Sequence, residues 1–437
     1  MKQPNSQFAQ DRQIETALVQ IEKPIYGGSF LARVEGKAVF VPLALPGERV
    51  RVRTTHEKRG FATAEVDQIV APAPERIAPA CPHFGACGGC AYQHANYAAQ
   101  LAFKQAILCE TLERGGVRAP KDIFVLSSDP WRYRNRIRLA FDAAGNVGYR
   151  GRRSHAVVPV TECPIAAPLL VNAAQAAASV AREFAPVLQF TEISLFCNVA
   201  ETALLATLFT ASPRRAGFEE FARALAARVS ALAGAELAFE GRPGEQPRTV
   251  ARWGETSLLY RAAGFDYRVD HGAFFQVNRW LVDALIDRVA AGRTGSLAWD
   301  LFAGVGLFAR RLAVGFGRVI AVESAPSATA ALAHNLSGAA ATAVKADTLS
   351  FLRRNTRVPR PDLIVADPPR TGLGEQACAL LGAIAAPALV YVSCDPATLA
   401  RDLCALLASG YAIQSVTLAD LFPQTFHLET VVHLGRA

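Results

Sequence analysis

WDLFAGVGLFARRLA, at residues 299–313, indicates the fold of the C-terminal part of the chain. An apolar strand is expected to end at Asp300, a turn with Gly304 and Gly306 follows, and a helical pattern begins directly after it. Glycines in such a turn let the backbone approach a ligand closely, as in nucleotide-binding strand–turn–helix units. The turn alone has low specificity, because a dinucleotide-dependent oxidoreductase would show it as well.

Three acidic residues close the strand-like stretches that follow. Glu323 ends RVIAVES, where a carboxylate can hold two ribose hydroxyls, and Asp347 ends ATAVKAD, where it could meet an adenine edge. Asp367 ends DLIVAD and runs into two prolines and Arg370. The alternation of strand and helix patterns predicts an α/β domain with a seven-stranded, largely parallel sheet and one reversed strand near the C-terminus.

A thiol follows the next predicted strand, in YVSCDPATLARDL at residues 391–403. Asp395 is a suitable helix N-cap and Pro396 suits the first helical position, so Cys394 is expected at the start of a helix. A helix N-terminus lowers the pKa of a cysteine, and the thiolate is the nucleophilic form. The alternative for any single cysteine is a buried core position.

A second group of cysteines lies near the N-terminus. Cys81, Cys87 and Cys90 stand among glycines in CPHFGACGGC, and Cys163 follows far downstream in TECPI. Three thiols this close together are arranged to turn around a metal. Tetrahedral thiolate sites suit zinc or an iron–sulfur cluster, and the spacing alone slightly favours zinc.

Five motifs resemble the RNA uracil-5-methyltransferase family: FFQVN, DLFAGVGLF, DPPRTGL, YVSCDPATLARDL and HLETVVHL. Together with the cysteine group they fall in order along most of the chain. The resemblance is closest to the ribosomal RNA enzymes that carry an iron–sulfur cluster and a TRAM domain, a small OB-like β-barrel. It implies S-adenosylmethionine (SAM) as methyl donor, carbon 5 of a uridine in 23S ribosomal RNA as target, and a [4Fe-4S] cluster held by Cys81, Cys87, Cys90 and Cys163.

The chemistry of uracil explains why such an enzyme needs a thiol. Carbon 5 is a poor nucleophile, and addition of a thiolate at carbon 6 makes an enolate that is nucleophilic at carbon 5. Cys394 is the candidate nucleophile, and Glu429 matches the family's general base, which removes the proton from carbon 5. Without the resemblance, Glu429 would read as a solvated acid at a strand end.

The resemblance also implies the binding residues. Asp367 is expected near nitrogen 3 and oxygen 4 of uracil and close to the cofactor, and Arg370 is expected to orient the base or a phosphate, with a surface salt bridge as its alternative. Gln276 matches a cofactor-site residue, although it could instead cap a helix. The complete expected cofactor site is Gln276, Phe302, Leu307, Glu323, Asp347 and Asp367. Leu307 departs from the family, which has Asn there, so only packing or a backbone contact is expected of it.

The chain is expected to divide into three parts. Short strand-like runs predict an OB-like barrel over residues 1–72, ending at the proline-rich APAPERIAPA. A central α/β domain with the cysteine group and an RNA-binding face is expected over 73–262, and the methyltransferase domain over 263–437. The family implies that a helix at about 95–125 packs on the catalytic domain. Alternating arginines in 131–138 are expected to line one sheet face and contact RNA phosphates.

Composition limits the class of protein. The chain has 437 residues, 51% of them hydrophobic, nine cysteines and a formal charge of +8, which suits an intracellular enzyme that contacts nucleic acid. The uncharged run 376–394 is split by Pro387 and is not expected to span a membrane. We expect a cytoplasmic monomer that binds RNA, and core positions for the remaining cysteines, which are Cys109, Cys197, Cys378 and Cys404.

Three alternatives stay open at this point. A transfer RNA could be the substrate instead of ribosomal RNA. An adenine amino-methyltransferase would also use a proline-rich strand end, but an exocyclic amine needs no covalent helper, so Cys394 and Glu429 would be idle. A non-catalytic RNA-binding or assembly factor could keep the same fold.

Overall fold

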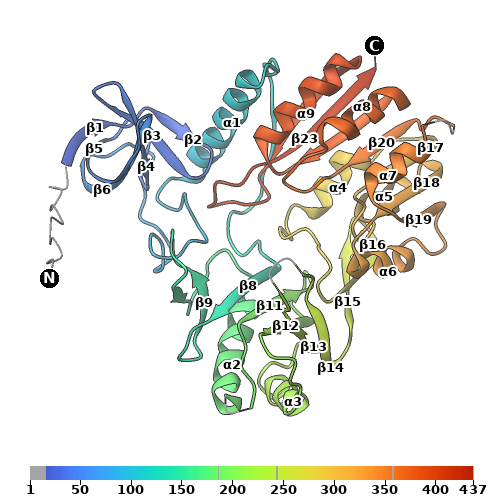
Figure 1. Cartoon of the computed structure of the whole chain (residues 1–437), viewed down its shortest axis with the longest axis horizontal. Coiled ribbons are helices and arrows are strands. Elements are labelled where there is room, and N and C mark those ends of the chain that lie inside the picture. The colour runs from blue at the N-terminus through green and yellow to red at the C-terminus, as the bar shows by residue number, and fades with distance from the viewer. Residues whose placement is uncertain (1–15, 186, 243–244, 357–358, 437) are drawn as a thin grey trace, which may run out of the picture.

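A computed structural model describes residues 16–185, 187–242, 245–356 and 359–436. In it the strands form three large sheets and one hairpin (Figure 1). The expected division at about residues 72 and 262 stays a prediction, and residues 1–15 of the expected barrel lie outside the described residues.

The N-terminal sheet has six strands in the order β1-β5-β6-β4-β3-β2. In β5 the sequence RVRVRTT alternates so that Val50 and Val52 are buried and the intervening arginines are exposed, as one buried sheet face requires. The strands are β1 (Thr16–Gln20), β2 (Lys23–Ile25), β3 (Ser29–Val34), β4 (Lys37–Pro42), β5 (Arg49–Glu57) and β6 (Phe61–Ala71).

A long helix, α1 (Tyr97–Arg114), connects this barrel to the catalytic part of the chain and lies between the two in Figure 1. Asn96 begins the helix by accepting a hydrogen bond from the backbone N–H of Ala99. Ile107 and Leu108 belong to the same buried cluster as the residues of the methyltransferase sheet. The expected packing of this helix on the catalytic domain is therefore confirmed.

The central sheet has seven strands in the order β10-β9-β8-β11-β12-β13-β14, with two helices packed against it. Asp142–Asn146 forms the turn between β8 and β9. The elements are β8 (Arg136–Phe141), β9 (Val147–Arg150), β10 (Val157–Pro159), α2 (Pro168–Phe184), β11 (Glu192–Cys197), β12 (Leu204–Thr210), α3 (Phe218–Arg228), β13 (Leu232–Phe239) and β14 (Arg248–Gly254).

A two-stranded hairpin, β15 (Ser257–Ala262) and β16 (Phe265–Asp270), follows the central sheet. Its buried Tyr260 and Tyr267 pack in one core with residues of the methyltransferase sheet. The predicted boundary at 262 falls in the turn of this hairpin.

The methyltransferase sheet has eight strands in the order β19-β18-β17-β20-β21-β23-β22-β7. The prediction of seven strands missed β7 (Phe124–Leu126), a three-residue strand from the segment after α1 that adds to the sheet edge beside β22. The other elements are α4 (Val282–Ala290), β17 (Gly295–Leu301), α5 (Leu307–Leu312), β18 (Phe316–Glu323), α6 (Pro326–Asn335), β19 (Ala341–Lys345), α7 (Thr348–Arg354), β20 (Leu363–Ala366), α8 (Gly374–Ile384), β21 (Ala388–Ser393), α9 (Pro396–Ala408), β22 (Tyr411–Ala419) and β23 (Glu429–Arg436).

The expected reversed strand is β23, which runs antiparallel to both of its neighbours. The uncharged run around Pro387 is divided between α8 and β21, as expected, and among the described residues no helix is long and apolar enough to cross a membrane. Cys197 and Cys378 are buried, but the core expectation is wrong for Cys404, which lies on the solvent-exposed face of α9.

Candidate active site

The glycine turn after β17 contains three residues with positive φ, which are Phe302, Gly304 and Gly306. Gly306 has φ of 93° at the start of α5, and a Cβ there would lie 2.9 Å from the Leu332 side chain, so only glycine fits. Phe302 also has a positive φ, of 62°, which is unfavourable for a large side chain. Strain of this kind concentrates where a backbone is shaped for a ligand.

Two carboxylates hold this turn in place. Glu323 accepts a hydrogen bond from Gly304 N–H at 2.9 Å with one oxygen and uses the other for the backbone after β18. Asp300 is fully buried and accepts a hydrogen bond from Ala309 N–H, and burial raises its pKa to about 8. The sequence placed Asp300 at the strand end but did not reveal its role in anchoring α5.

Four of the six expected cofactor residues line one pocket at the carboxyl ends of β17 and β20: Gln276, Phe302, Leu307 and Asp367. Gln276 does not cap the following helix, because Asn278 accepts the hydrogen bonds from Trp280 and Leu281 N–H instead. Phe274, whose side chain is 61% exposed, lines the same pocket and was missed by the sequence analysis.

Asp347 and Glu323 lie outside the lining of that pocket. Asp347 is the N-cap of α7, where its carboxylate accepts a hydrogen bond from Ser350 N–H at 3.0 Å. A side chain that caps a helix can still present its second oxygen to a ligand, and the contact of Asp347 with adenine stays a prediction.

Sheet register brings the expected nucleophile and base together. Ser393 at the end of β21 pairs with Thr430 of the antiparallel β23, so Cys394, which follows Ser393, and Glu429, which precedes Thr430, lie across from each other. Asp367 follows the neighbouring parallel strand β20 and reaches the same edge. As expected, Asp395 caps α9 by accepting from Ala397 and Thr398 N–H, with Pro396 at the first helical position.

The electrostatics of this group differ from the expectation. Burial raises the pKa of the Cys394 thiol to about 12, and the Glu429 and Asp367 carboxylates add to the increase while Arg370 opposes it. The predicted depression by the helix N-terminus is therefore wrong for the ligand-free protein, because desolvation and two nearby carboxylates outweigh the helix dipole. Burial likewise raises the pKa of Asp367 to about 7 and that of Glu429 well above its usual range.

Arg370 is exposed, and its backbone carbonyl accepts a hydrogen bond from the Thr398 hydroxyl. Its charge acts on Cys394 and on His427, whose pKa is lowered to about 4 by burial and by neighbouring cations. The alternative of a surface salt bridge finds no support, because no carboxylate within the described ranges pairs with this guanidinium.

The segment 420–428, which precedes Glu429, is held by residues far away in the sequence. The Gln100 side chain makes two hydrogen bonds with Gln424, and the backbone N–H groups of Ala91 and Tyr92 donate to the Gln424 carbonyl. The Tyr133 hydroxyl donates to Pro423. No local sequence signal marks these partners, since each contact joins elements that are distant along the chain.

The four expected metal ligands, Cys81, Cys87, Cys90 and Cys163, line one pocket between the glycine-rich loop and the central sheet. Burial raises the pKa of each thiol, that of Cys90 to about 12. Within the described part of the chain, no three His, Cys, Asp or Glu side chains converge closely enough to hold a single metal ion.

The sulfur atoms in this pocket face hydrogen-bond donors. Gly89 N–H donates to Cys87 Sγ at 3.3 Å, the Gln93 side chain donates to Cys90 Sγ at 3.3 Å, and backbone N–H groups after Cys163 face its sulfur. The Arg134 guanidinium lies beside the pocket and favours the charged form of Cys90.

The alternating arginines of 131–138 were expected to line one sheet face and contact RNA, but not all of them face solvent. Arg134 is directed toward the cysteines, and Arg136 is partly buried, where it donates to Ala273 O and lies 4.4 Å from the Phe196 ring centre. The strand β8 starts only at Arg136. Aromatic residues such as Phe196 pack against the side of the sheet that carries Arg136 and bury it in part. Of the four arginines in this run, Arg132 and Arg138 are exposed.

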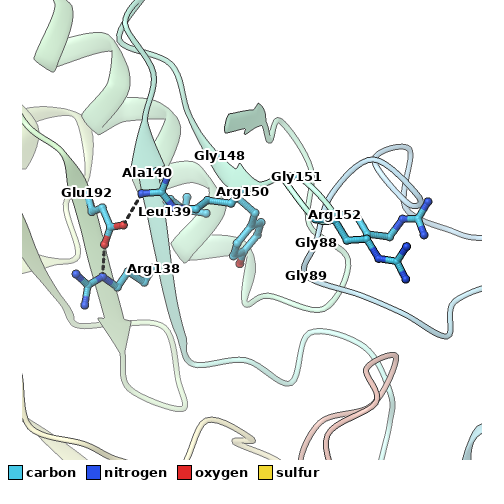
Figure 2. A pocket seen from close by; sticks show the side chains of 12 residues that line it. Gly88, Gly89, Arg138, Leu139, Ala140, Gly148, Arg150, Gly151, Arg152 and Glu192 are labelled. Carbon is cyan, nitrogen blue, oxygen red and sulfur yellow. Dashed lines mark hydrogen bonds and ion pairs between the residues drawn. The ribbon is translucent and has the colours of Figure 1, made fainter. Parts of the chain in front are cut away.

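A groove of about 700 Å³ lies between the cysteine loop and the β8–β9 strands (Figure 2). Arg138 and Arg150 both point to Glu192, and Arg152 and the exposed Arg153 lie at the other end. The two walls are joined by Gly88 N–H, which donates to Arg150 O at 3.0 Å. Four arginines therefore line the groove; Arg138 and Arg150 pair with Glu192, and Arg152 pairs with Glu65 at 3.3 Å.

Known proteins are similar to this chain over its N-terminal sheet, its catalytic C-terminal part and nearly its whole length. A TRAM domain matches residues 11–66, and the tRNA (Uracil-5-)-methyltransferase family model matches residues 360–437. The chain is 33% identical to the 23S rRNA (uracil(1939)-C(5))-methyltransferase RlmD of Halomonas elongata, over 94% of this chain and 87% of that protein. It is 32% identical to an uncharacterized RNA methyltransferase of Streptomyces avermitilis, over 96% of this chain and 98% of that protein.

A crystal structure of the Pyrococcus abyssi tRNA (uracil-54, C5)-methyltransferase in complex with S-adenosyl-L-homocysteine has a similar fold. The TM-score is 0.76 at 24% identity, covering 96% of this chain and all of that one (100%). This likeness supports the fold: a Rossmann-like methyltransferase sheet with an N-terminal barrel. Taken with the relatives that match nearly the whole length, it shows that the chain belongs to the RNA uracil-5-methyltransferase family, with an N-terminal TRAM domain.

Proposed function

We propose that the protein methylates carbon 5 of a uridine in 23S ribosomal RNA, with SAM as methyl donor, through a transient bond between Cys394 and carbon 6. The observation that carries this proposal is the register of β21 and β23, which sets a thiol opposite a buried carboxyl group beside the cofactor pocket. The RlmD relatives name the RNA and the carbon atom.

In the proposed reaction the Cys394 sulfur loses its proton and adds to carbon 6, and the electron pair of the 5,6 double bond moves to carbon 5 and the carbonyl at carbon 4. Asp367, with a pKa of about 7, is protonated in part of the molecules at neutral pH and can donate a hydrogen bond to that carbonyl. Once carbon 5 has accepted the methyl group, Glu429 removes the proton that remains on carbon 5, and the sulfur leaves as the 5,6 double bond re-forms.

SAM supplies an electrophilic methyl group when it is bound. The pocket formed by Gln276, Phe302, Leu307 and Asp367 would hold it, next to the strained turn whose shape Glu323 fixes. Its position at the carboxyl ends of parallel strands is where this class of fold binds ligands. Asp347, at the end of the adjacent strand, would contact the adenine.

The alternatives are less well supported. An adenine amino-methyltransferase would leave the pairing of Cys394 with Glu429 without a purpose. A tRNA substrate is named for the similar Pyrococcus abyssi enzyme, but that likeness concerns the fold alone, whereas the relatives that match over most of the chain name 23S rRNA. A non-catalytic factor would need neither the thiol nor the cofactor pocket.

We also propose that Cys81, Cys87, Cys90 and Cys163 hold a [4Fe-4S] cluster. A zinc ion, with Zn–S of about 2.3 Å, would draw its sulfur ligands to within about 3.8 Å of one another. The cysteines share one pocket without converging on a single ion position, which suits the larger cluster, and the N–H donors at Cys87 and Cys90 suit charged sulfurs. The cluster would tie the loop to the central sheet.

RNA is the proposed partner of the arginine groove. Its guanidinium groups would neutralise phosphates of the strand that flanks the target uridine, and Glu192 would keep Arg138 and Arg150 oriented. We expect the protein to act as a monomer in the cytoplasm, where reducing conditions preserve its thiols.

The decisive experiment uses RNA containing 5-fluorouridine, in which fluorine replaces the proton that Glu429 must remove. We expect the wild-type protein with SAM to form an adduct that survives denaturing electrophoresis, and Cys394→Ala to form none. Methyl transfer to natural 23S rRNA without any trapped adduct would refute the covalent route and favour transfer to an amine.

A further inference from the structure

A strained turn lies in the segment that leads to the proposed base. Gln424 is buried and has φ of 67°, in the left-handed region that is unfavourable for a residue with a side chain. The preceding Pro423 has no backbone N–H, and the N–H of Gln424 donates to the Gln100 side chain. Strained backbone persists only where its surroundings fix it. The partners of the two remaining carbonyl groups therefore decide how the chain continues toward Glu429.

The carbonyl group of Gln424 is held by the cysteine loop. The backbone N–H groups of Ala91 and Tyr92, which directly follow Cys90, donate to it at 2.9 and 3.0 Å. The Cys90 sulfur accepts a hydrogen bond from the Gln93 side chain on the other side of these two residues. A displacement of Cys90 is therefore passed directly to Gln424.

The carbonyl group of Pro423 is held by Tyr133, whose side chain is fully buried. The Tyr133 hydroxyl donates to it at 3.0 Å and accepts a hydrogen bond from Arg134 Nε at 3.3 Å. Because the guanidinium group supplies one donor, the phenol proton is directed at Pro423. Arg134 also lines the cysteine pocket.

The backbone around Tyr133 is paired with the chain that follows the fourth cysteine, Cys163. Arg132 and Arg134, the residues on either side of Tyr133, donate backbone hydrogen bonds of 2.9 Å to the carbonyl groups of residues 164–165. The position of the phenol is therefore fixed by the segment that carries Cys163, whereas the other three cysteines belong to the loop that contacts Gln424.

An unpartnered polar atom supports an occupant for the cysteine pocket. His83 lines the pocket, and its Nε2 is buried without a hydrogen-bond partner among the described residues. A buried polar atom of this kind is costly unless a bound group or water satisfies it. A group bound by cysteines of both segments would fix the distance between those segments.

Resting on the function and the cluster proposed above, we propose that the cysteine pocket positions the base for the second half of methyl transfer. Its two segments hold the Pro423–Gln424 turn, one through the backbone after Cys90 and the other through the Tyr133 hydroxyl. This turn sets Glu429 against the proton on carbon 5. Tyr133 is thus a positioning residue for Glu429, and a small misplacement of a catalytic group lowers the rate steeply.

The first test compares Tyr133→Phe with Tyr92→Phe in the full-length protein. Both hydroxyls are buried, but that of Tyr92 has no hydrogen-bond partner within the described ranges, and its backbone contact does not depend on the phenol. In a single turnover on ordinary RNA, we expect Tyr133→Phe to release the methylated adduct roughly 3- to 10-fold more slowly, as the loss of one hydrogen bond predicts.

Trapping on 5-fluorouridine RNA separates this effect from a general loss of structure. Fluorine takes the place of the proton that Glu429 removes, so formation of the trapped adduct does not need a well-placed base. Tyr133→Phe should therefore form this adduct at the wild-type rate, and Tyr92→Phe should match the wild-type protein in both measurements.

Hydrogen exchange of peptides covering 420–428, without RNA or SAM, tests the pocket independently of the proposed function. We expect faster exchange in Tyr133→Phe and also in Cys163→Ser, although no backbone hydrogen bond of the described chain joins Cys163 to this segment. Cys197→Ser is the control, because Cys197 is a buried cysteine of β11 outside the pocket. Peptides from α6, none of whose residues lines the pocket, should exchange at the wild-type rate in all variants.

Three results would overturn the proposal: release of the adduct at the wild-type rate in Tyr133→Phe, equal slowing of trapping and release, or unchanged exchange of 420–428 in Cys163→Ser. If the wild-type protein traps no 5-fluorouridine RNA, the proposed function fails. The exchange rates then still decide whether the cysteine pocket holds the turn.

Discussion

A buried ion pair connects α1 to the segment that carries the proposed base. Lys104 Nζ lies 2.5 Å from Asp420 Oδ1, and both side chains are fully buried (0% exposed). The amine also donates to Phe422 O at 2.8 Å, and the Tyr97 hydroxyl donates to the other oxygen of Asp420 at 2.8 Å. Burial lowers the pKa of Lys104 although Asp420 opposes the change, so the pair is costly to desolvate.

Replacing Lys104 by methionine removes the charge and leaves the Asp420 carboxylate buried with a single donor. Breaking a buried pair in this way costs about 3–5 kcal/mol, because the remaining charge is uncompensated. The double variant Lys104→Met/Asp420→Leu should recover most of that loss, since an apolar pair of similar volume avoids the desolvation of both charges. The unpaired Asp420 carboxylate, and not a change in side-chain volume, is therefore the expected cause of the lost stability in Lys104→Met.

Hydrogen exchange of peptides covering 420–428 measures this local stability. Each tenfold change in exchange rate corresponds to about 1.36 kcal/mol of stability. A loss of about 3–5 kcal/mol should therefore make exchange roughly 150- to 5,000-fold faster in Lys104→Met. Lys23→Met is the control, because its pair with Glu110 is 44% and 34% exposed and should change exchange little. Unchanged exchange in Lys104→Met, or a double variant no more protected than the single one, would refute the reasoning.

Four further outcomes are expected. Glu429→Gln should accumulate the methylated covalent adduct on ordinary RNA, seen on denaturing gels, because the carbon 5 proton stays in place; rapid release would exclude Glu429 as base. Wild-type Cys394 should be alkylated slowly below pH 9 and faster as pH rises toward its pKa of about 12, and a rate that levels off near neutral pH would contradict the raised pKa. Arg150→Ala should weaken RNA binding and lower the salt dependence by about 0.7 per lost phosphate contact, whereas Arg223→Ala on the far helix α3 should leave the slope unchanged. Cys163→Ser should purify with less iron and sulfide than wild type; equal iron, or zinc in both, would count against the cluster.

Local patterns were sufficient for much of the fold. The strand end at Asp300, the glycine turn, and the N-cap and proline that begin α9 depend on neighbours within a few residues, and the structure contains all of them. The three-residue strand β7 was missed because so short a run has no period to detect, and it becomes a strand only through pairing with β22.

The pKa of Cys394 shows where local reasoning fails. A helix N-terminus alone would lower it, but the register of β23 and the end of β20 bring Glu429 and Asp367 to the thiol, and burial adds to their effect. The prediction for Arg134 and Arg136 fails for a similar reason. Their alternation is correct for a strand, but which side of that strand is buried depends on the aromatic residues packed against it.

The order of residues along the chain is enough to predict the candidate nucleophile and to find the glycine turn, the cysteine group and the family, because each of these is a short pattern whose chemistry is carried by adjacent side chains. The charge state of the thiol and the contacts that hold segment 420–428 arise only when distant segments pack together. Desolvation and Coulomb energies depend on distances in space, and those distances exist only in the folded chain.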